Sequence, residues 1–479
     1  MLDPQDRSWR QTARQLTQVL VDTSPSVIDL GGVDLTDTLE QTFFGVLRRQ
    51  PPPRRVLGGD RLRAALRVAA AAARGFRPAT APTGRVLVLV KRSIRATVFR
   101  PIGAELQRRG LPEPLVVGLD PRLARHGEAA VDLTRQLGIS EALRLFRFVR
   151  TVVGASLPVD EWRAIAPRTQ VDVLAAVVRQ TLPRLAVDAA RLDAIVTRLG
   201  PTGLVAFQEV GPWARIIPAV GRARGVPTVD LPHAEANDPI GAFELRYDAI
   251  AVYGPRSAQL LEDVGVERAR IHQVGPLRYD ALVRATAAQQ DAAPSDRRRV
   301  VYASQPVKAR AGLNEAAKRT TYRSALAAAA AAAPSELVVR PHPNEPLDDL
   351  RRLLASEKAP AGVTVTLEPN VDLHDLLPGA WLLVTANSQS VFEAAIVGVP
   401  SISVSADSTS LVTHVEEGFS TGATDPASTA SVARGLLQAD ARASVVSRAR
   451  NALRERFGDL DGHAAERAAS LIQAVVRGG

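Results

Sequence analysis

The chain has 479 residues, with 60 lysines and arginines against 50 aspartates and glutamates, a net charge of +10, and no cysteine. The lack of cysteine excludes disulfides and thiolate metal sites, and the 46% apolar and 23% charged content is typical of a globular protein with two or three domains. No apolar run approaches the roughly 18 residues that cross a bilayer, and no secretory signal begins the sequence. We therefore expect a cytoplasmic protein, at most peripheral at the inner face of the cell membrane.

The positive charge favours an anionic ligand or an anionic membrane surface as partner. Nucleic-acid binding is disfavoured, because the sequence has no helix-turn-helix pattern, zinc-finger spacing or basic strand interleaved with aromatic residues. Aromatic residues make up only 4% of the chain, too few for a base-stacking surface.

The first 80 residues are expected to form a helical extension. Apolar residues recur at three- and four-residue steps over 6–21 and 36–49, which predicts two amphipathic helices. Residues 61–77 are predicted to form a basic, alanine-rich helix. Two interpretations of this helix stay open: its alanine face packs on a sheet, or its arginines rest on an anionic membrane near a lipid-linked acceptor.

Residues 81–284 alternate between short β-branched runs and helical segments, which predicts a Rossmann-like parallel sheet covered by helices. A helical stretch at about 130–200 is expected to be an insertion in this domain, a common place for acceptor-binding elements. The expected strands are 85–90, 115–118, 203–207, 227–231, 248–253 and 271–274.

Ligands of parallel sheets bind beyond the carboxyl ends of the strands, so residues that follow a strand are the candidates for chemistry. In this first domain, Glu209 and His233 follow two expected strands. An acceptor hydroxyl loses a proton as it attacks, and a carboxylate or imidazole is the usual base. We expect Glu209 to be the base and His233 a contact in the cleft, although each is equally suited to a structural hydrogen bond.

Residues 285–298 are polar and are expected to link this domain to a second Rossmann-like domain at 299–479. Ser304 and Gln305 follow its first strand and either contact the nucleotide or simply end the strand. Four cations near the next helix are expected to attract phosphate: Lys308, Arg310, Lys318 and Arg319.

Two further strand ends carry the chemistry on which the functional interpretation depends. Residues 340–343 read Arg-Pro-His-Pro, so two prolines restrict the turn that carries His342. Farther along, Asn387 or Ser388 is a suitable helix N-cap, and no acidic side chain appears before Glu393, so this helix start offers donors to an anion. A positively charged loop with a histidine, next to a helix start of this kind, is suited to bind a diphosphate. The alternative is that the two features have no ligand, the histidine being a surface residue and the serine an ordinary helix cap.

Four short runs together resemble the C-terminal half of GT-B glycosyltransferases that build bacterial capsules and other surface polysaccharides. These runs are residues 340–343, 372–377, 385–393 and 398–400. The resemblance extends to sialyltransferases with a His-Pro motif and to CDP-glycerol glycerophosphotransferases. It implies an α/β fold of the GT-B type, with two Rossmann-like parallel-sheet domains that face each other across a cleft.

The resemblance also implies roles for individual residues. His342 would contact the donor phosphate together with Ser388 and Ser390, Glu393 would lie near the ribose, and the loop that carries His374 would lie over the base. The serine pair is commonly adjacent in those families, whereas Gln389 separates the two serines here. The complete predicted site has catalytic residues Glu209, His233 and His342, phosphate-binding residues Arg340, His342, Ser388 and Ser390, and nucleotide-binding residues Ser304, Gln305, His374, Asn387 and Glu393.

These features predict a transferase that moves a glycosyl or polyol-phosphate group from a nucleotide-activated donor to a cell-surface glycan or lipid-linked acceptor. We expect no metal and no cofactor other than the nucleotide-sugar substrate, because His342 and the helix start would receive the charge of the departing phosphate. One alternative is a non-hydrolysing nucleotide-sugar epimerase with the same architecture. The other is a non-catalytic nucleotide- or sugar-binding component of a polysaccharide assembly complex.

Overall fold

The chain forms two compact units in the computed structural model. The first comprises Met1–Arg278 together with His463–Gly479, and the second comprises Tyr279–Gly462. The structure describes residues 4–48, 83–90, 94–118, 130–167, 169, 171–207, 212–232, 245–288, 298–307, 313–405 and 413–478. No helix among them is both long and apolar enough to cross a bilayer.

The first unit is built on a seven-stranded parallel sheet with the order β3-β2-β1-β4-β5-β6-β7. Its central strands are short, continuous apolar runs and are buried along their whole length, as parallel strands covered on both faces require. The strands are β1 Val86–Val90, β2 Leu115–Gly118, β3 Ala130–Asp132, β4 Gly203–Phe207, β5 Thr228–Leu231, β6 Ala249–Val252 and β7 Ile271–Gln273. Six of them lie where the sequence predicts strands, and β3 is an addition.

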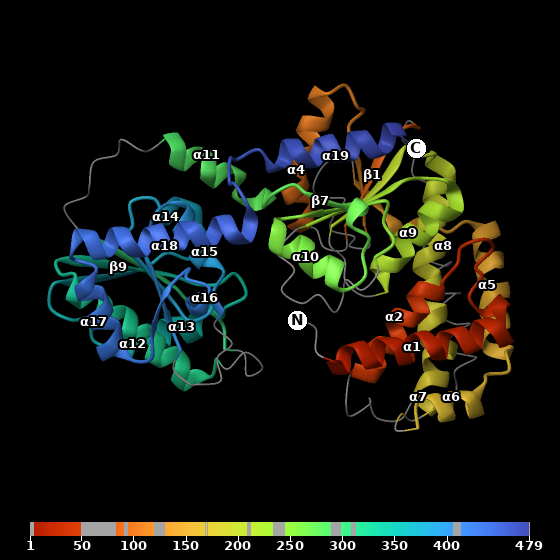
Figure 1. The fold of residues 1–479 in the computed structure, drawn as a ribbon, viewed down its shortest axis with the longest axis horizontal. Helices are drawn as coiled ribbons and strands as arrows, with labels where there is room; N and C mark the ends of the chain where they lie inside the picture. Colours follow the sequence, from red (N-terminus) through yellow and green to blue (C-terminus); the bar gives the residue numbers. More distant parts are fainter. Residues whose placement is uncertain are drawn as a thin grey trace. The chain divides into compact units, whose positions relative to one another are not determined.

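Alternate residues of β1 enter two separate cores, because successive side chains of a strand point to opposite faces. Leu87 and Leu89 share a core with residues of α8 and α9, whereas Val86, Val88 and Val90 share one with residues of α4 and α19. Figure 1 shows these helices around the first sheet. The helices of this unit outside the N-terminal pair are α4 Ile94–Arg108, α5 Ile139–Gly154, α6 Val159–Ile165, α7 Val171–Ala176, a π-helical turn Val177–Thr181, α8 Leu182–Leu199, α9 Trp213–Arg224, α10 Pro255–Asp263 and the late helix α19 Ala464–Gly478. Within the range of about 130–200, where a helical insertion was predicted, the structure has β3 followed by α5 to α8.

The predicted N-terminal helices are α1 Pro4–Thr23 and α2 Thr36–Arg48, which pack against each other. A buried polar network ties them to α9. Arg10 pairs with Glu40 at 3.2 Å, and Gln41 accepts hydrogen bonds from Arg10 at 3.4 Å and from Arg215 of α9 at 3.3 Å. Burial and the neighbouring Arg10 lower the pKa of Arg215 to about 10. The predicted basic helix at 61–77 lies outside the described residues.

The second unit has a six-stranded parallel sheet with the order β10-β9-β8-β11-β12-β13. Its strands are β8 Arg298–Ala303, β9 Ser335–Arg340, β10 Val363–Leu367, β11 Leu382–Thr385, β12 Ser401–Val404 and β13 Thr421–Ala423. Its helices are α11 Asp280–Ala288, α12 Glu315–Ala331, α13 Leu347–Ala355, α14 Leu373–Leu376, α15 Ser390–Ile396, α16 Thr413–Glu416, α17 Pro426–Gly435 and α18 Ala439–Phe457. Within this unit, α12, α13 and α17 cover one face of the sheet, and α15 and α18 cover the other (Figure 1).

The structure divides the chain differently from the sequence-based expectation of one domain over 299–479. Helix α19 belongs to the first unit, where Ala468, Ala469 and Ile472 are fully buried beside β4 and β5. Arg467 on this helix also donates to the Val274 carbonyl at 2.8 Å. An amphipathic helix buries its apolar stripe wherever a matching surface exists, and here that surface lies on the first sheet.

The expected linker at 285–298 also needs correction at both ends. Residues 285–288 form the last turn of α11, in an alanine-rich segment that favours helix, and Arg298 begins β8. Residues 289–297 lie outside the described part of the chain.

Candidate functional site

Three neighbouring strands of the second sheet end side by side and bring the predicted residues of this unit together. β8 lies between β9 and β11, with Ala303 level with Arg340 on one side and with Thr385 on the other. Ser304, His342 and Asn387 therefore follow three adjacent strand ends. Such an edge is where parallel sheets bind their ligands.

Hydrogen bonds join these turns to one another. The Ser304 N–H donates to the Arg340 carbonyl at 2.9 Å, which extends the ladder between β8 and β9. The Asn387 N–H donates to the side-chain oxygen of Gln305 at 3.0 Å, which connects the turns after β8 and β11. Ser304 and Gln305, expected to touch a nucleotide, thus hold the neighbouring turns in place.

His342 lies in a tight turn that fixes its ring. The Glu345 N–H donates to the His342 carbonyl at 2.8 Å, and the Asn344 N–H donates to His342 Nδ1 at 3.1 Å. A ring nitrogen that accepts a hydrogen bond carries no proton, so the neutral imidazole of this arrangement has its hydrogen on Nε2. The side chain is half-buried, and its Nε2–H is suited to donate to a phosphate oxygen.

Glu345 is the residue at this edge that the sequence analysis missed. It is buried, and its carboxylate accepts from the His342 N–H at 3.0 Å and from Ser304 Oγ at 2.8 Å. The same carboxylate forms a salt bridge with Lys318 of α12, which is also buried. A signal was present in the sequence, since an acidic residue three positions after His342 can close a turn onto the histidine N–H.

The salt bridge corrects the expectation that Lys318 attracts phosphate, because a buried carboxylate already neutralises its charge. Arg319 likewise pairs with Glu357 at 2.9 Å. The other two cations of that prediction, Lys308 and Arg310, lie outside the described residues.

Arg340 connects the histidine turn to the next loop. Its guanidinium donates to the Val371 carbonyl at 3.3 Å and to the carbonyl of Pro341. Val371 precedes α14, so Arg340 fixes the loop between β10 and that helix. A guanidinium has five N–H donors, so these two bonds still leave donors for an anion.

The turn after β11 differs in detail from its prediction. α15 begins at Ser390, and Gln389 occupies the N-cap position without a side-chain cap, whereas Asn387 or Ser388 was expected there. Ser388 Oγ instead accepts from the Ser390 N–H at 3.2 Å. Among described residues, the N–H groups of Ser388 and Gln389 have no acceptor. α15 has only seven residues, so these donors, rather than the helix dipole, are what an anion would meet.

Ser390 is one of several described residues with a buried hydroxyl group that makes no hydrogen bond. The residue is 4% exposed, and its Oγ has no hydrogen-bond partner among the described residues. Buried hydroxyl groups are normally paired, so the Ser390 hydroxyl is a candidate contact for a ligand at this edge.

His374 and Glu393, both predicted to contact the nucleotide, lie against each other. His374 Nε2 is 3.5 Å from a carboxylate oxygen of Glu393, which is 4% exposed. The N-cap Asp372 accepts from the His374 N–H at 2.9 Å and so starts α14 at this position. The pair connects α14 with α15, next to the turn that carries Ser390.

The two predicted catalytic residues of the first unit, Glu209 and His233, lie outside the described residues. Among the residues that the structure describes, no three histidine, aspartate or glutamate side chains gather closely enough to hold a metal ion. The predicted independence from metal stays a prediction.

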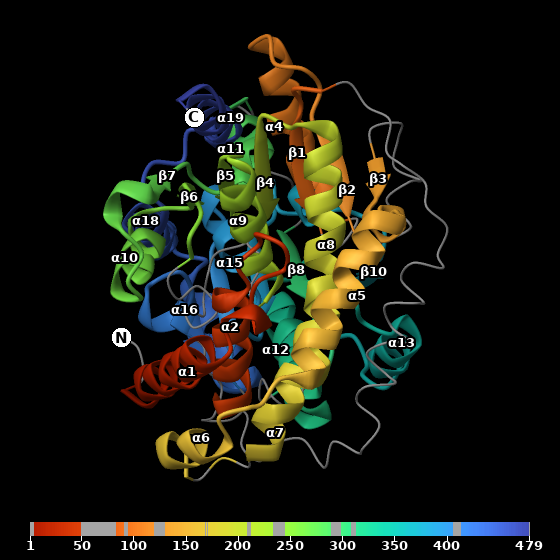
Figure 2. The same ribbon diagram turned by 90° about the vertical axis from the view of Figure 1, so that its right-hand side faces the viewer.

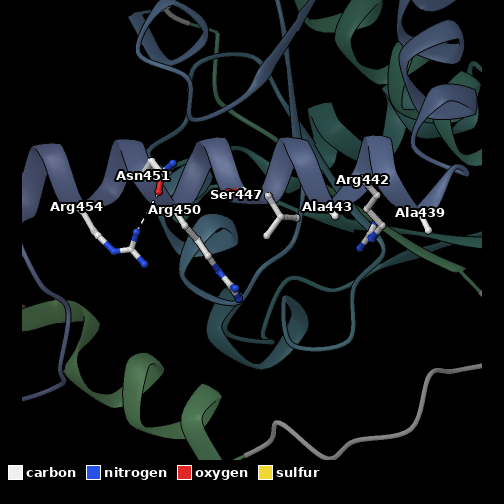
Figure 3. Close-up of a pocket in the computed structure, with 8 residues that line it drawn as sticks. Ala439, Arg442, Ala443, Ser447, Arg450, Asn451 and Arg454 are labelled. Carbon is white, nitrogen blue, oxygen red and sulfur yellow. Dashed lines mark hydrogen bonds between the residues drawn. The ribbon is translucent and has the colours of Figure 1, made fainter.

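The structure also has an open hollow of about 520 Å³ along α18 (Figure 3). All of its lining residues come from this one helix, among them Arg442, Arg450 and Arg454. Arg442 also donates to the Trp381 carbonyl at 2.7 Å and lies over the Trp381 ring. A surface formed by a single helix does not enclose a ligand, so we do not assign the site there.

Comparison with known proteins supports the fold. No family model and no curated protein matches the sequence. A solved structure of a putative UDP-N-acetylglucosamine 2-epimerase from Listeria monocytogenes is similar, with 14% identity, a TM-score of 0.51, and 83% of this chain and 98% of that chain covered. The UDP-GlcNAc 2-epimerase from Neisseria meningitidis, solved with UDP-GlcNAc bound, has 12% identity, a TM-score of 0.50, and coverage of 82% and 100%. MurG of Acinetobacter baumannii has 11% identity, a TM-score of 0.46, and coverage of 82% and 99%.

At these identities the similarity is one of fold. Together with the two parallel sheets, it identifies a GT-B-like architecture of two Rossmann-like domains. The predicted fold class is confirmed in these terms.

Proposed function

We propose that the second unit binds the diphosphate of a nucleotide-activated sugar at the joined ends of β8, β9 and β11. The observation that carries this proposal is the hydrogen-bonded set of turns at one edge of the sheet, which presents His342 after β9 and, after β11, a buried Ser390 hydroxyl that has no partner among the described residues. Hydroxyl, imidazole and backbone N–H donors are the groups that bind phosphate oxygens. The Neisseria structure, solved with UDP-GlcNAc, supports a nucleotide sugar as the ligand of this fold.

The reaction we propose is transfer of the glycosyl group to an acceptor hydroxyl. The bond between the anomeric carbon and the phosphate oxygen breaks, a bond to the acceptor oxygen forms, and the nucleoside diphosphate leaves with the electron pair. Donors that are already in place when this charge develops lower the barrier without further reorganisation. His342 would supply one donor, and the turn at Ser388 would supply the others.

The acceptor proton needs a base, and we assign this role to Glu209, with His233 as a contact to the acceptor. In the sequence, each of these residues comes two positions after a strand of the first sheet, β4 or β5, and residues that follow parallel strands are the candidates for chemistry. A glycan or a lipid-linked sugar is the acceptor class we propose. Movement of a polyol-phosphate group would use the same donor site.

An epimerase is the second candidate, because two solved structures with this fold carry that name. An epimerase changes the configuration of the sugar and needs no acceptor, whereas a transferase releases nucleotide as it transfers the sugar to an acceptor. A non-catalytic nucleotide- or sugar-binding protein would bind the same ligand and catalyse neither reaction.

Two measurements on the full chain test the proposal. The first compares the melting temperature of the protein with CMP, CDP, UDP and GDP, which identifies the nucleotide base that it recognises. We expect one of the diphosphates to raise the melting temperature. With the corresponding nucleotide sugars, we expect nucleotide release that increases when an acceptor glycan is added. Interconversion of sugar epimers without an acceptor would favour the epimerase, and binding without either reaction would favour the non-catalytic protein. Stabilisation by none of the nucleotides would count against both the transferase and the epimerase.

A further inference from the structure

Three large apolar side chains lie exposed along one helix of the first unit. Ile139, Leu143 and Phe146 of α5 are 82%, 54% and 48% exposed. Among the described residues, only Val307 and Leu437, at 40% and 41%, are comparably exposed large apolar side chains, and they lie on other elements. Three of these five residues therefore share one face of one helix. Exposed apolar residues that are scattered singly over a surface need no explanation, but a contiguous patch indicates an interaction site.

The spacing makes these residues a continuous stripe. Steps of four and three residues place Ile139, Leu143 and Phe146 above one another, along roughly 10 Å of helix. The opposite face of α5 is an ordinary core face, with Leu145, Phe148, Val149, Val152 and Val153 buried. That buried face packs on α8, and α5 lies alongside this helix in the structure (Figure 2).

The charges next to the stripe are positive. Arg147 and Arg150 follow Leu143 and Phe146 by four residues, so they continue the stripe, and both are exposed. Arg135, just before the helix, is exposed as well. The one acidic residue of α5, Glu141, lies nearly on the opposite side from the stripe, where it accepts a hydrogen bond from Ser140.

This combination fits a lipid surface better than a second copy of the chain. Antiparallel two-fold pairing of α5 about Leu143 would place Arg150 of one copy near Arg135 of the other, and like charges at an interface are unfavourable. A bilayer with anionic headgroups satisfies both features, because Ile, Leu and Phe enter the boundary of the acyl chains while arginines contact phosphate.

We propose that the stripe of Ile139, Leu143 and Phe146, together with Arg147 and Arg150, docks the first unit on a membrane rich in anionic phospholipid. α5 lies flat on the surface and does not insert as a spanning helix. The proposal goes beyond the proposed function and needs neither a donor nor an acceptor. A docked first unit would meet a lipid-linked acceptor by diffusion in two dimensions.

Flotation of the full-length protein with vesicles tests this proposal. Vesicles of phosphatidylcholine alone are compared with vesicles that also contain phosphatidylglycerol, at low and at physiological salt. We expect binding to the anionic vesicles and weaker binding as salt rises. The double variant Arg147→Gln/Arg150→Gln should bind about 25-fold more weakly, at about fivefold for each arginine. The affinity of the triple variant Ile139→Ser/Leu143→Ser/Phe146→Ser for these vesicles should be at least about tenfold lower.

Leu437→Ser is the control, since it removes another exposed large apolar side chain, from the second unit. It should bind vesicles as the unchanged protein does. All five mutated side chains of α5 are exposed, so the variants should keep the melting temperature, and the arginine pair decides the question if the triple variant does not fold.

Three results would overturn the proposal. The first is a failure of the unchanged protein to float with anionic vesicles at low salt. The second is binding that Arg147→Gln/Arg150→Gln and the triple variant both leave unchanged. The third is a dimer in light scattering that the triple variant converts to monomer without any vesicle binding, which would assign the stripe to a second copy of the chain.

Discussion

Lys318 and Glu345 form a salt bridge inside the second unit, where their side chains are 5% and 0% exposed. The bridge joins α12 to the turn that carries His342, because Glu345 also accepts from the His342 N–H and from Ser304 Oγ. Burial of one of these charges without the other would be costly, so the two side chains depend on each other. The lysine therefore holds the candidate site in shape and does not bind the ligand.

This dependence predicts a strong effect of Lys318→Met. The substitution leaves Glu345 as an unpaired buried carboxylate and should cost about 3–5 kcal/mol of unfolding free energy. The double variant Lys318→Met/Glu345→Gln removes both charges and should recover more than half of that loss. Urea unfolding of the four proteins of this cycle measures the coupling. A cost of less than about 1 kcal/mol for Lys318→Met, the usual size for exposed pairs, would show that the bridge is not buried in solution.

A second prediction concerns His342 as a phosphate ligand. His342→Ala should weaken the affinity for a nucleoside diphosphate about 10- to 100-fold, the size of one hydrogen bond to a charged group, and should leave the weak affinity for the nucleoside unchanged. His272→Ala removes a half-buried histidine from the first unit and is the control. Isothermal titration calorimetry gives both affinities. An equal loss for nucleoside and diphosphate would contradict a role at the phosphate.

The two serines after β11 should respond differently to removal of their hydroxyl groups. Ser388 Oγ accepts the Ser390 N–H, so Ser388→Ala should lower the free energy of unfolding by about 0.5–1.5 kcal/mol, the usual net contribution of one hydrogen bond. Ser390 Oγ has no partner among the described residues, so Ser390→Ala should leave stability unchanged or slightly raise it. The same change should weaken diphosphate binding. Thermal melts with and without nucleotide separate the two effects, and a Ser390→Ala protein that loses stability but binds normally would contradict this assignment.

Helix α19 supports a prediction about the first unit alone. Ile472 is fully buried there, so Ile472→Ala should lower the free energy of unfolding by about 2–5 kcal/mol. Hydrogen exchange should increase in β4 and β5, which α19 contacts, and should stay unchanged in β8 and β9 of the second unit. Arg477 of the same helix is exposed, so Arg477→Ala serves as the control. Faster hydrogen exchange in β8 and β9, with β4 and β5 unchanged, would show that α19 packs on the second unit and would contradict this assignment.

Much of this architecture could be predicted from the sequence, because each central strand is a short apolar run followed by an amphipathic helix. The ranges 85–90 and 203–207 predicted strands, and β1 and β4 lie within them. The partner of α19 could not be predicted. Its apolar periodicity specifies which side is buried, but two sheets of the same kind are available to cover that side.

The candidate site shows a similar division. The strand-end positions of His342 and Ser388 could be predicted, because parallel strands end at one edge of their sheet. The salt bridge of Lys318 with Glu345 could not, since the two residues lie 27 positions apart and a lysine near a helix start attracts a phosphate and a carboxylate alike. Only the fold shows which anion the lysine meets.

A crystal structure of the chain with a bound nucleoside diphosphate tests the central claim most directly. We predict a phosphate oxygen at about 2.7–3.2 Å from His342 Nε2, with the Ser388 turn and Ser390 Oγ on the same phosphate groups. A nucleotide bound with its phosphates away from the ends of β9 and β11, or a His342 ring that does not contact it, would contradict the account.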